Sequence, residues 1–169
     1  MSTPAPTPTI RRPSPQEIDA LRKWLESQLN PWWRTGTPFS ATFGWADIFA
    51  ADNWHCIYCG RDLAESEDVL AESTEDHLVP QTLLTTGDAK AHTANNVAAC
   101  CASCNGLKGP AVPEKDSPAW QSRAAYVTAL RAYIDAERAS RAAKYRVQAF
   151  KARAKRIWNK SDARQKDYL

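Results

Sequence analysis

Two Cys-x-x-Cys pairs separated by 41 residues constrain the fold of this chain more than any other sequence feature. Each pair can present two thiolates from a tight turn, and two such turns complete a tetrahedral zinc site. A single pair can also be redox-active, but two pairs in a chain of 169 residues are better explained by a metal. Four thiolates leave no open coordination position, so we expect one structural zinc ion. Its predicted ligands are Cys56, Cys59, Cys101 and Cys104.

The cysteine count also indicates the compartment. Five clustered cysteines do not resemble the even, dispersed pattern of a secreted disulfide scaffold, so we expect a reducing cytoplasm. Residues 1–15 are rich in Pro and Thr without an apolar core, and no run of about 18 apolar residues occurs, so we expect neither a signal peptide nor a membrane span. The fifth cysteine, Cys100, is expected to be a small buried hydrophobic residue.

The segment between the two pairs is too long for a simple zinc ribbon, which needs about 15–20 residues there. It contains Asp76-His77, a carboxylate beside an imidazole, followed by Leu-Val-Pro. Asn96 then precedes the second pair, and Asn105 and Lys108 follow it. Such a group of side chains, gathered at a strand end, can form one small site that holds a metal and a water molecule.

The order Cys-x-x-Cys, Asp-His-x-x-Pro, Asn-Val, Cys-x-x-Cys-Asn-x-x-Lys resembles the HNH endonuclease family in its cysteine-bearing ββα-metal form. The resemblance covers roughly residues 45–115 and depends on all the elements in order. It implies an α+β fold: a small ββα-metal, treble-clef-like nuclease core stapled by zinc, here flanked by N- and C-terminal α-helices. It also implies a metal-dependent endonuclease that hydrolyses phosphodiester bonds in DNA, by nicking or by double-strand cleavage.

The resemblance assigns roles to individual residues. His77 is the implied general base that activates water, and Asp76 and Asn105 are the implied ligands of a catalytic divalent ion. Asn96 matches the middle Asn, which ties down the loop and helps to orient the base. One carboxylate and one amide oxygen form a hard site, so we expect Mg²⁺ or Mn²⁺. Lys108 is expected to contact a neighbouring phosphate.

Several alternatives remain open on the sequence. Asn105 is also a good residue to cap a short helix, and His55 and His92 have no companions that favour catalysis. The whole chain can instead be a treble-clef zinc module that binds nucleic acid without cutting it. A toxin-like nuclease that acts on RNA or on a mixed substrate is a further alternative. The group Asp76, His77 and Asn105 favours the enzyme, because a binder needs none of them.

Four segments are expected: a disordered Pro/Thr-rich tail (1–13), an N-terminal helix and loop (14–44), the nuclease domain (45–117) and a basic helical extension (118–169). Pro15 and Glu17 mark the start of the first helix, and a second helix is expected over 45–51. Strands are expected at 54–58, 77–79 and 97–100, a loop over 60–75 and a short helix from Ala102.

The charge is distributed unevenly. Residues 119–169 contain 13 Lys and Arg against four Asp and Glu, whereas the preceding part is acidic. A basic extension suggests a polyanion partner, although a merely solvated helix face gives the same pattern. Its first part can also pack on the core through Tyr126, Leu130 and Ile134. The predicted nucleic-acid contacts in the extension are Arg141, Arg146, Lys151, Arg153, Lys155 and Arg156.

Overall fold

A computed structural model describes residues 9–29, 31–36, 44–84 and 93–166 of the chain, with side chains described as far as residue 155. The chain divides into two compact units, Met1–Ile134 and Asp135–Leu169, which are considered separately below. The longest helix, α5 (Arg123–Lys166), contributes residues to both units. The first turns of α5 belong to the first unit, and the domain boundary expected near residue 118 stays a prediction.

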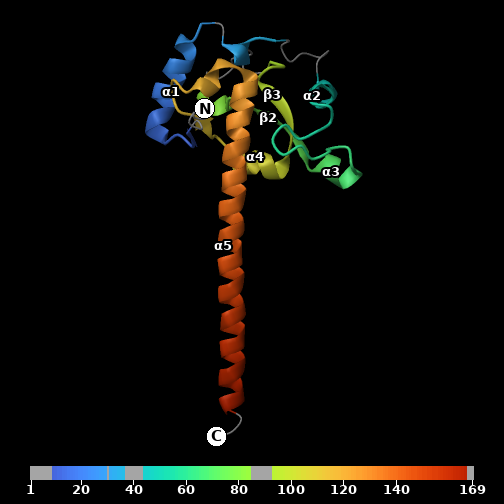
Figure 1. The fold of residues 1–169 in the computed structure, drawn as a ribbon, viewed down its shortest axis with the longest axis vertical. Helices are drawn as coiled ribbons and strands as arrows, with labels where there is room; N and C mark the ends of the chain where they lie inside the picture. Colours follow the sequence, from blue (N-terminus) through green and yellow to red (C-terminus); the bar gives the residue numbers. More distant parts are fainter. Residues whose placement is uncertain (1–8, 30, 37–43, 85–92, 167–169) are drawn as a thin grey trace, which may run out of the picture. The chain divides into compact units, whose positions relative to one another are not determined.

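The centre of the first unit is a ββα arrangement (Figure 1). Strand β2 (Ser73–His77) pairs antiparallel with β3 (Val97–Cys101), with Ser73 opposite Cys101 and His77 opposite Val97. Helix α4 (Ala102–Lys108) follows β3 without a loop and contacts both strands. The expected α+β fold with a small ββα core is therefore confirmed, as is the strand at 97–100.

The other expected strands were placed wrongly. Of residues 77–79, only His77 belongs to β2. The residues of β2 are polar, so no apolar pattern marked this strand, and the apolar residues of the strand pair come from the buried β3. The segment 60–75, expected as a loop, contains α3 (Glu67–Ala71) and the start of β2. Residues 54–58 form turns rather than a strand, with a single bridge between His55 and Asp62.

The N-terminal elements surround this core. Helix α1 (Pro15–Ser27) begins at Pro15 as expected, and α2 (Trp45–Ala51) has the expected bounds. Residues 1–8 lie outside the described residues, but Ile10–Arg11 forms a strand, β1, instead of continuing a disordered tail. This strand pairs antiparallel with β4 (Val112–Pro113), so that backbone hydrogen bonding orders a segment with little apolar content.

Short 3₁₀ turns carry much of the aromatic core. They are η1 (Trp32–Arg34) and η4 (Pro118–Gln121), whereas a third turn, η2 (Gln81–Leu83), contributes the buried Leu83. The ring of Trp120 lies 5.2 Å from that of Trp33 and 5.0 Å from that of Tyr126, centroid to centroid. Such edge-on contacts stabilise aromatic pairs beyond the burial of their area. Trp33 and Trp120 thus pack in the core.

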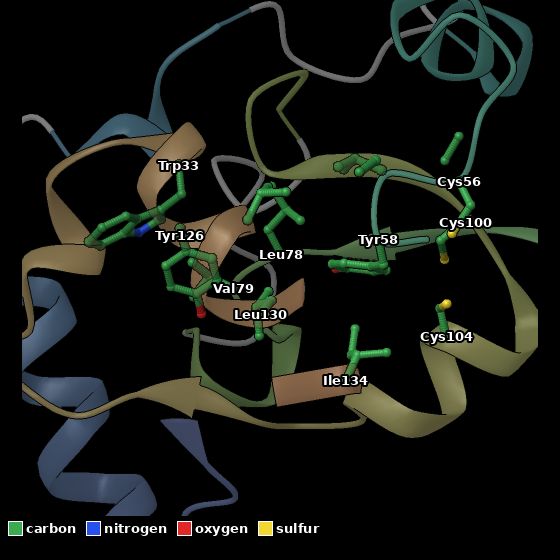
Figure 2. Close-up of a cluster of buried hydrophobic side chains, with 14 of the residues drawn as sticks. Trp33, Cys56, Tyr58, Leu78, Val79, Cys100, Cys104, Tyr126, Leu130 and Ile134 are labelled. Atoms are coloured by element: carbon green, nitrogen blue, oxygen red, sulfur yellow. The ribbon is translucent and has the colours of Figure 1, made fainter. Parts of the chain in front are cut away.

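Helix α5 is continuous, where the sequence suggested two helical stretches. No Gly or Pro occurs after Pro118, so nothing in the sequence breaks the backbone hydrogen bonding. Tyr126, Leu130 and Ile134 are buried in the first unit, as expected for a helix that packs on the core. Figure 2 shows Tyr126 and Leu130 beside Leu78 and Val79, with Ile134 between them and the end of the same buried cluster that holds Cys56, Cys100 and Cys104.

In the second unit, the side chains that the structure describes are mostly exposed. Tyr145 and Phe150 are 68% and 74% exposed. Because few of these side chains are buried, burial contributes little to the stability of this part of the helix. Its many Ala and Arg residues stabilise it instead through their high intrinsic helix propensity.

Candidate functional site

The four predicted zinc ligands converge. Their sulfur atoms all lie within 4.8 Å of one another. Cys56 and Cys59 come from a tight turn closed by the hydrogen bond from the Gly60 amide to the Cys56 carbonyl, and Gly60 has a positive φ of 72° that favours glycine. Cys101 ends β3 and Cys104 lies in the first turn of α4. The chain therefore contains two knuckles that face each other.

The distances suit a tetrahedral ion. Zinc bound to four sulfur atoms at about 2.3 Å separates them by about 3.8 Å, and the Sγ atoms of Cys59 and Cys101 are 4.0 Å apart. A hydrogen bond from Cys104 lowers the pKa of Cys56 to about 4. The cluster is arranged to bind a metal, and its all-sulfur donor set fits a structural zinc ion.

The fifth cysteine takes no part in this cluster. Cys100 is fully buried, and burial raises the pKa of its thiol far above the ordinary value. It is therefore a neutral thiol in the core, as the sequence suggested.

A second cluster lines an open groove of about 440 Å³ where the end of β2 meets α4. Asp76 and His77 contribute from β2, and Asn105 contributes from α4. The structure thus brings together three of the four residues to which the sequence assigned catalysis. The remaining residues lining the groove are Glu75, Pro80, Gln81, Thr82, Lys108, Gly109 and Pro110.

Two side chains of the protein hold the carboxylate of Asp76. Its carboxylate accepts hydrogen bonds from the hydroxyl of Tyr58 and from the ammonium group of Lys108. Burial raises the pKa of Asp76, and the charge of Lys108 opposes that rise. Burial, followed by the charge of Asp76, raises the pKa of Tyr58 well above its ordinary value, so its hydroxyl remains a donor. Asp76 is only 8% exposed, and that exposed part lies in the groove.

These contacts leave limited room for a cation. A carboxylate has about four lone-pair sites. Tyr58 uses one on Oδ2, and the Lys108 Nζ atom lies 3.0 Å from both Oδ1 and Oδ2. By this count Asp76 keeps about one free lone-pair site. Asn105 lines the same groove, and a carboxylate and an amide oxygen are donors of the kind that Mg²⁺ and Mn²⁺ prefer.

Lys108 does not fit the phosphate contact expected from the sequence. Its side chain is 1% exposed, and its Nζ atom also donates to the His77 carbonyl at 2.7 Å. Although Lys108 lines the groove, the Asp76 carboxylate and the carbonyl oxygens of His77 and Gly109 already accept hydrogen bonds from its ammonium group. Lys108 thus binds the end of β2 to α4.

His77 ends β2 and is partly exposed. Its Nε2 atom lies 3.0 Å from Nε2 of Gln81, a residue of η2 that the sequence analysis missed. Gln81 follows Pro80 and stands four residues after His77, and this spacing was the only available signal. Tyr58 was also missed, although it lies inside the first Cys-x-x-Cys pair.

Asn96 lies outside the lining of the groove and is fully buried. Its Oδ1 accepts from the Val79 amide at 2.9 Å, and its Nδ2 donates to the Val79 carbonyl at 3.2 Å. The Leu78 amide donates to the Asn96 carbonyl. Asn96 therefore fastens the segment that follows His77, and its effect on the base stays a prediction.

The remaining candidates are dispersed. The Nδ1 atom of His55 contacts the Asn53 carbonyl and not the sulfur cluster, and His92 lies outside the described residues. The side chains of Arg141, Arg146, Lys151, Arg153 and Lys155 are exposed in the second unit. Arg156 belongs to α5, but its side chain lies beyond the described ones.

Comparisons with known proteins give one match. No curated protein and no solved structure matches the chain. Among the described residues, no helix is long and apolar enough to span a lipid bilayer. Residues 56–110 match the family model described as HNH endonuclease, a segment that contains all four metal-binding cysteines and the ββα core. This part of the chain is therefore similar to an HNH endonuclease domain, a similarity that implies a nuclease-type fold.

Proposed function

We propose that this protein is a metal-dependent endonuclease that hydrolyses phosphodiester bonds in DNA. The observation that carries the proposal is the convergence of Asp76, His77 and Asn105 on one open groove within the segment that matches the HNH model. A structural zinc site at the other end of the ββα core would hold the strands and α4 in place.

In this proposal, His77 is the general base. A neutral imidazole nitrogen accepts a proton from water near neutral pH, and the resulting hydroxide attacks the phosphorus. Gln81, beside Nε2, would restrict the orientation of the ring. Asn96 would act on the general base indirectly, because it fixes the backbone of the segment after His77.

Asp76 and Asn105 would hold a Mg²⁺ or Mn²⁺ ion. When bound, such an ion polarises the scissile phosphate and stabilises the departing 3′ oxygen. Tyr58 and Lys108 would set the direction of the Asp76 carboxylate, since they hold it from the protein side. The exposed basic residues of the second unit would contribute sequence-independent affinity for the phosphate backbone.

A second candidate function is a treble-clef module that binds nucleic acid without cleavage. The Lys108–Asp76 contact favours it, because this ion pair already neutralises the main carboxylate of the groove. A binder of this kind would need the zinc site and the basic helix, but neither His77 nor Asn105.

Incubation of the purified protein with plasmid DNA, with and without Mg²⁺ or Mn²⁺, separates the two candidates. We expect metal-dependent cleavage by the parent protein and a loss of about 10²–10⁴-fold in rate for His77→Ala, with zinc content unchanged. His55→Ala is the matched control, because His55 contacts a backbone carbonyl outside the groove. Asn105→Ala should instead raise the Mn²⁺ concentration required.

The absence of metal-dependent cleavage of DNA or RNA by the parent protein would favour the non-catalytic module. Cleavage by His77→Ala at the parent rate would show that the general base is another group.

A further inference from the structure

Arg12 reaches the candidate groove from outside the matched segment. It follows strand β1, and its Nη2 atom donates to the Leu107 carbonyl at 3.1 Å. Its guanidinium group also lies against Gly109, 3.3 Å from the point that a Cβ atom of that residue would occupy. Gly109 lines the groove. These contacts place a cation at the edge of the groove formed by the end of α4.

Gly109 makes this approach possible. Its φ of 51° is a backbone conformation that favours glycine, and a side chain there would press on the Arg12 guanidinium. The chain thus leaves space for the arginine at this edge. Arg12 itself is exposed, so the face of the guanidinium that does not contact α4 is open to a ligand.

The charge of Arg12 is available, unlike that of its neighbour. Arg11 pairs with Glu17 at 2.6 Å and approaches Glu114 at 3.9 Å. Among the residues that the structure describes, no carboxylate lies within 4.0 Å of Arg12. Lys108, the other cation at this end of the groove, is neutralised by Asp76. Arg12 uses one N–H group on Leu107, and its other donors remain.

We propose that Arg12 binds a phosphate group of the nucleic-acid strand that lies in the groove. This proposal rests on the proposed function. The groove also presents the carboxylate of Glu75, which repels a polyanion, so a cation at its edge favours entry of the strand. The planar guanidinium can donate two parallel hydrogen bonds to one phosphate, which fixes the position of the strand.

Arg12→Gln and Arg11→Gln form a matched pair, because they remove the same charge from adjacent residues that have different partners. Binding of each variant to a fluorescently labelled DNA duplex is measured over a range of salt concentrations, and cleavage kinetics are measured on the same duplex. For Arg12→Gln we expect an increase of about tenfold in Kd and KM, a kcat like that of the parent, and a salt slope shallower by about 0.9. Arg11→Gln should keep the parent values.

Arg12→Lys tests the geometry, since it keeps the charge without the planar fork. We expect the salt slope of the parent with a KM between those of the parent and Arg12→Gln. Equal Kd, KM and salt slope for Arg12→Gln and Arg11→Gln would overturn the proposal and leave Arg12 as a cap of α4. If the parent binds DNA but does not cleave it, the binding curves still test Arg12, so failure of the proposed function is distinguishable from failure of this inference.

Discussion

Lys108 and Asp76 form a buried ion pair beneath the candidate groove, with Nζ 3.0 Å from each carboxylate oxygen. The two residues come from α4 and β2, and their side chains are 1% and 9% exposed. Lys108 also donates to the His77 carbonyl. The pair thus connects the helix to the strand end that carries both Asp76 and His77, and it couples the stability of the ββα core to the geometry of the groove.

Removal of one partner should therefore be costly. Lys108→Met would leave the Asp76 carboxylate buried without its counter-charge, which typically costs about 3–5 kcal/mol. Urea denaturation of the zinc-loaded protein measures this change in the free energy of unfolding. The double variant Asp76→Asn/Lys108→Met should recover part of the loss, because no unpaired charge remains. A Lys108→Met protein as stable as the parent would mean that the pair does not form in solution.

Metal removal should unfold the core. Cys104→Ser takes away one of four sulfur ligands, and binding energy at such sites is folding energy. We expect one zinc ion per parent chain and loss of both zinc and cooperative unfolding in Cys104→Ser, measured by metal analysis and circular dichroism. Cys100→Ala is the control, since Cys100 adjoins the cluster without belonging to it. Retention of full stability in a zinc-free Cys104→Ser protein would rule out the structural role.

The sequence predicted those features that depend on local spacing. The sulfur cluster follows from two Cys-x-x-Cys pairs, and the start of α1 follows from Pro15 and Glu17. The predicted position of strand β2 was wrong because its residues are polar and its burial comes from β3, whose paired residues lie 20 to 28 positions further along the chain.

Three of the residues predicted for the candidate site line one groove, but their contacts were not predicted. The residues of the Asp-His pair and Asn105 share one groove, as the family resemblance implied. The burial of Lys108 could not be predicted, because it depends on a partner 32 residues away. The approach of Arg12 to Leu107 joins residues 95 positions apart, and no local pattern reports such a contact.

Glu17 gives a prediction for pH dependence. Its Oε2 atom accepts from the Ser14 amide at 2.8 Å, and hydrogen bonds from Arg11 and then Ser14 lower the pKa of Glu17 to about 2 from 4.5. Since the folded pKa is below the unfolded value, the stabilisation is present above about pH 4.5 and is lost as the pH falls towards 2.

Glu17→Gln should accordingly have a lower Tm than the parent at neutral pH, and the difference should shrink below about pH 4.5. Parent and variant are compared at each pH, so loss of zinc in acid affects both. A difference in Tm that is constant across this range would show that the carboxylate charge contributes nothing to the cap.

Truncation after Ser140 tests the basic helix separately from the core. It removes ten Lys and Arg against two Asp, and it leaves the first unit, which ends at Ile134, intact. We expect normal zinc content and a Tm close to that of the parent. DNA binding should weaken, and the plot of log Kd against log salt should be shallower by about 0.9 for each phosphate that the protein no longer neutralises.

A full-length control with Arg146, Lys151, Arg153 and Lys155 replaced by Gln keeps the helix and should also weaken binding. Unchanged affinity in both proteins at low and high salt would show that the basic residues of α5 are a solvated face, and unfolding of the truncated protein would show that residues after Ser140 stabilise the core.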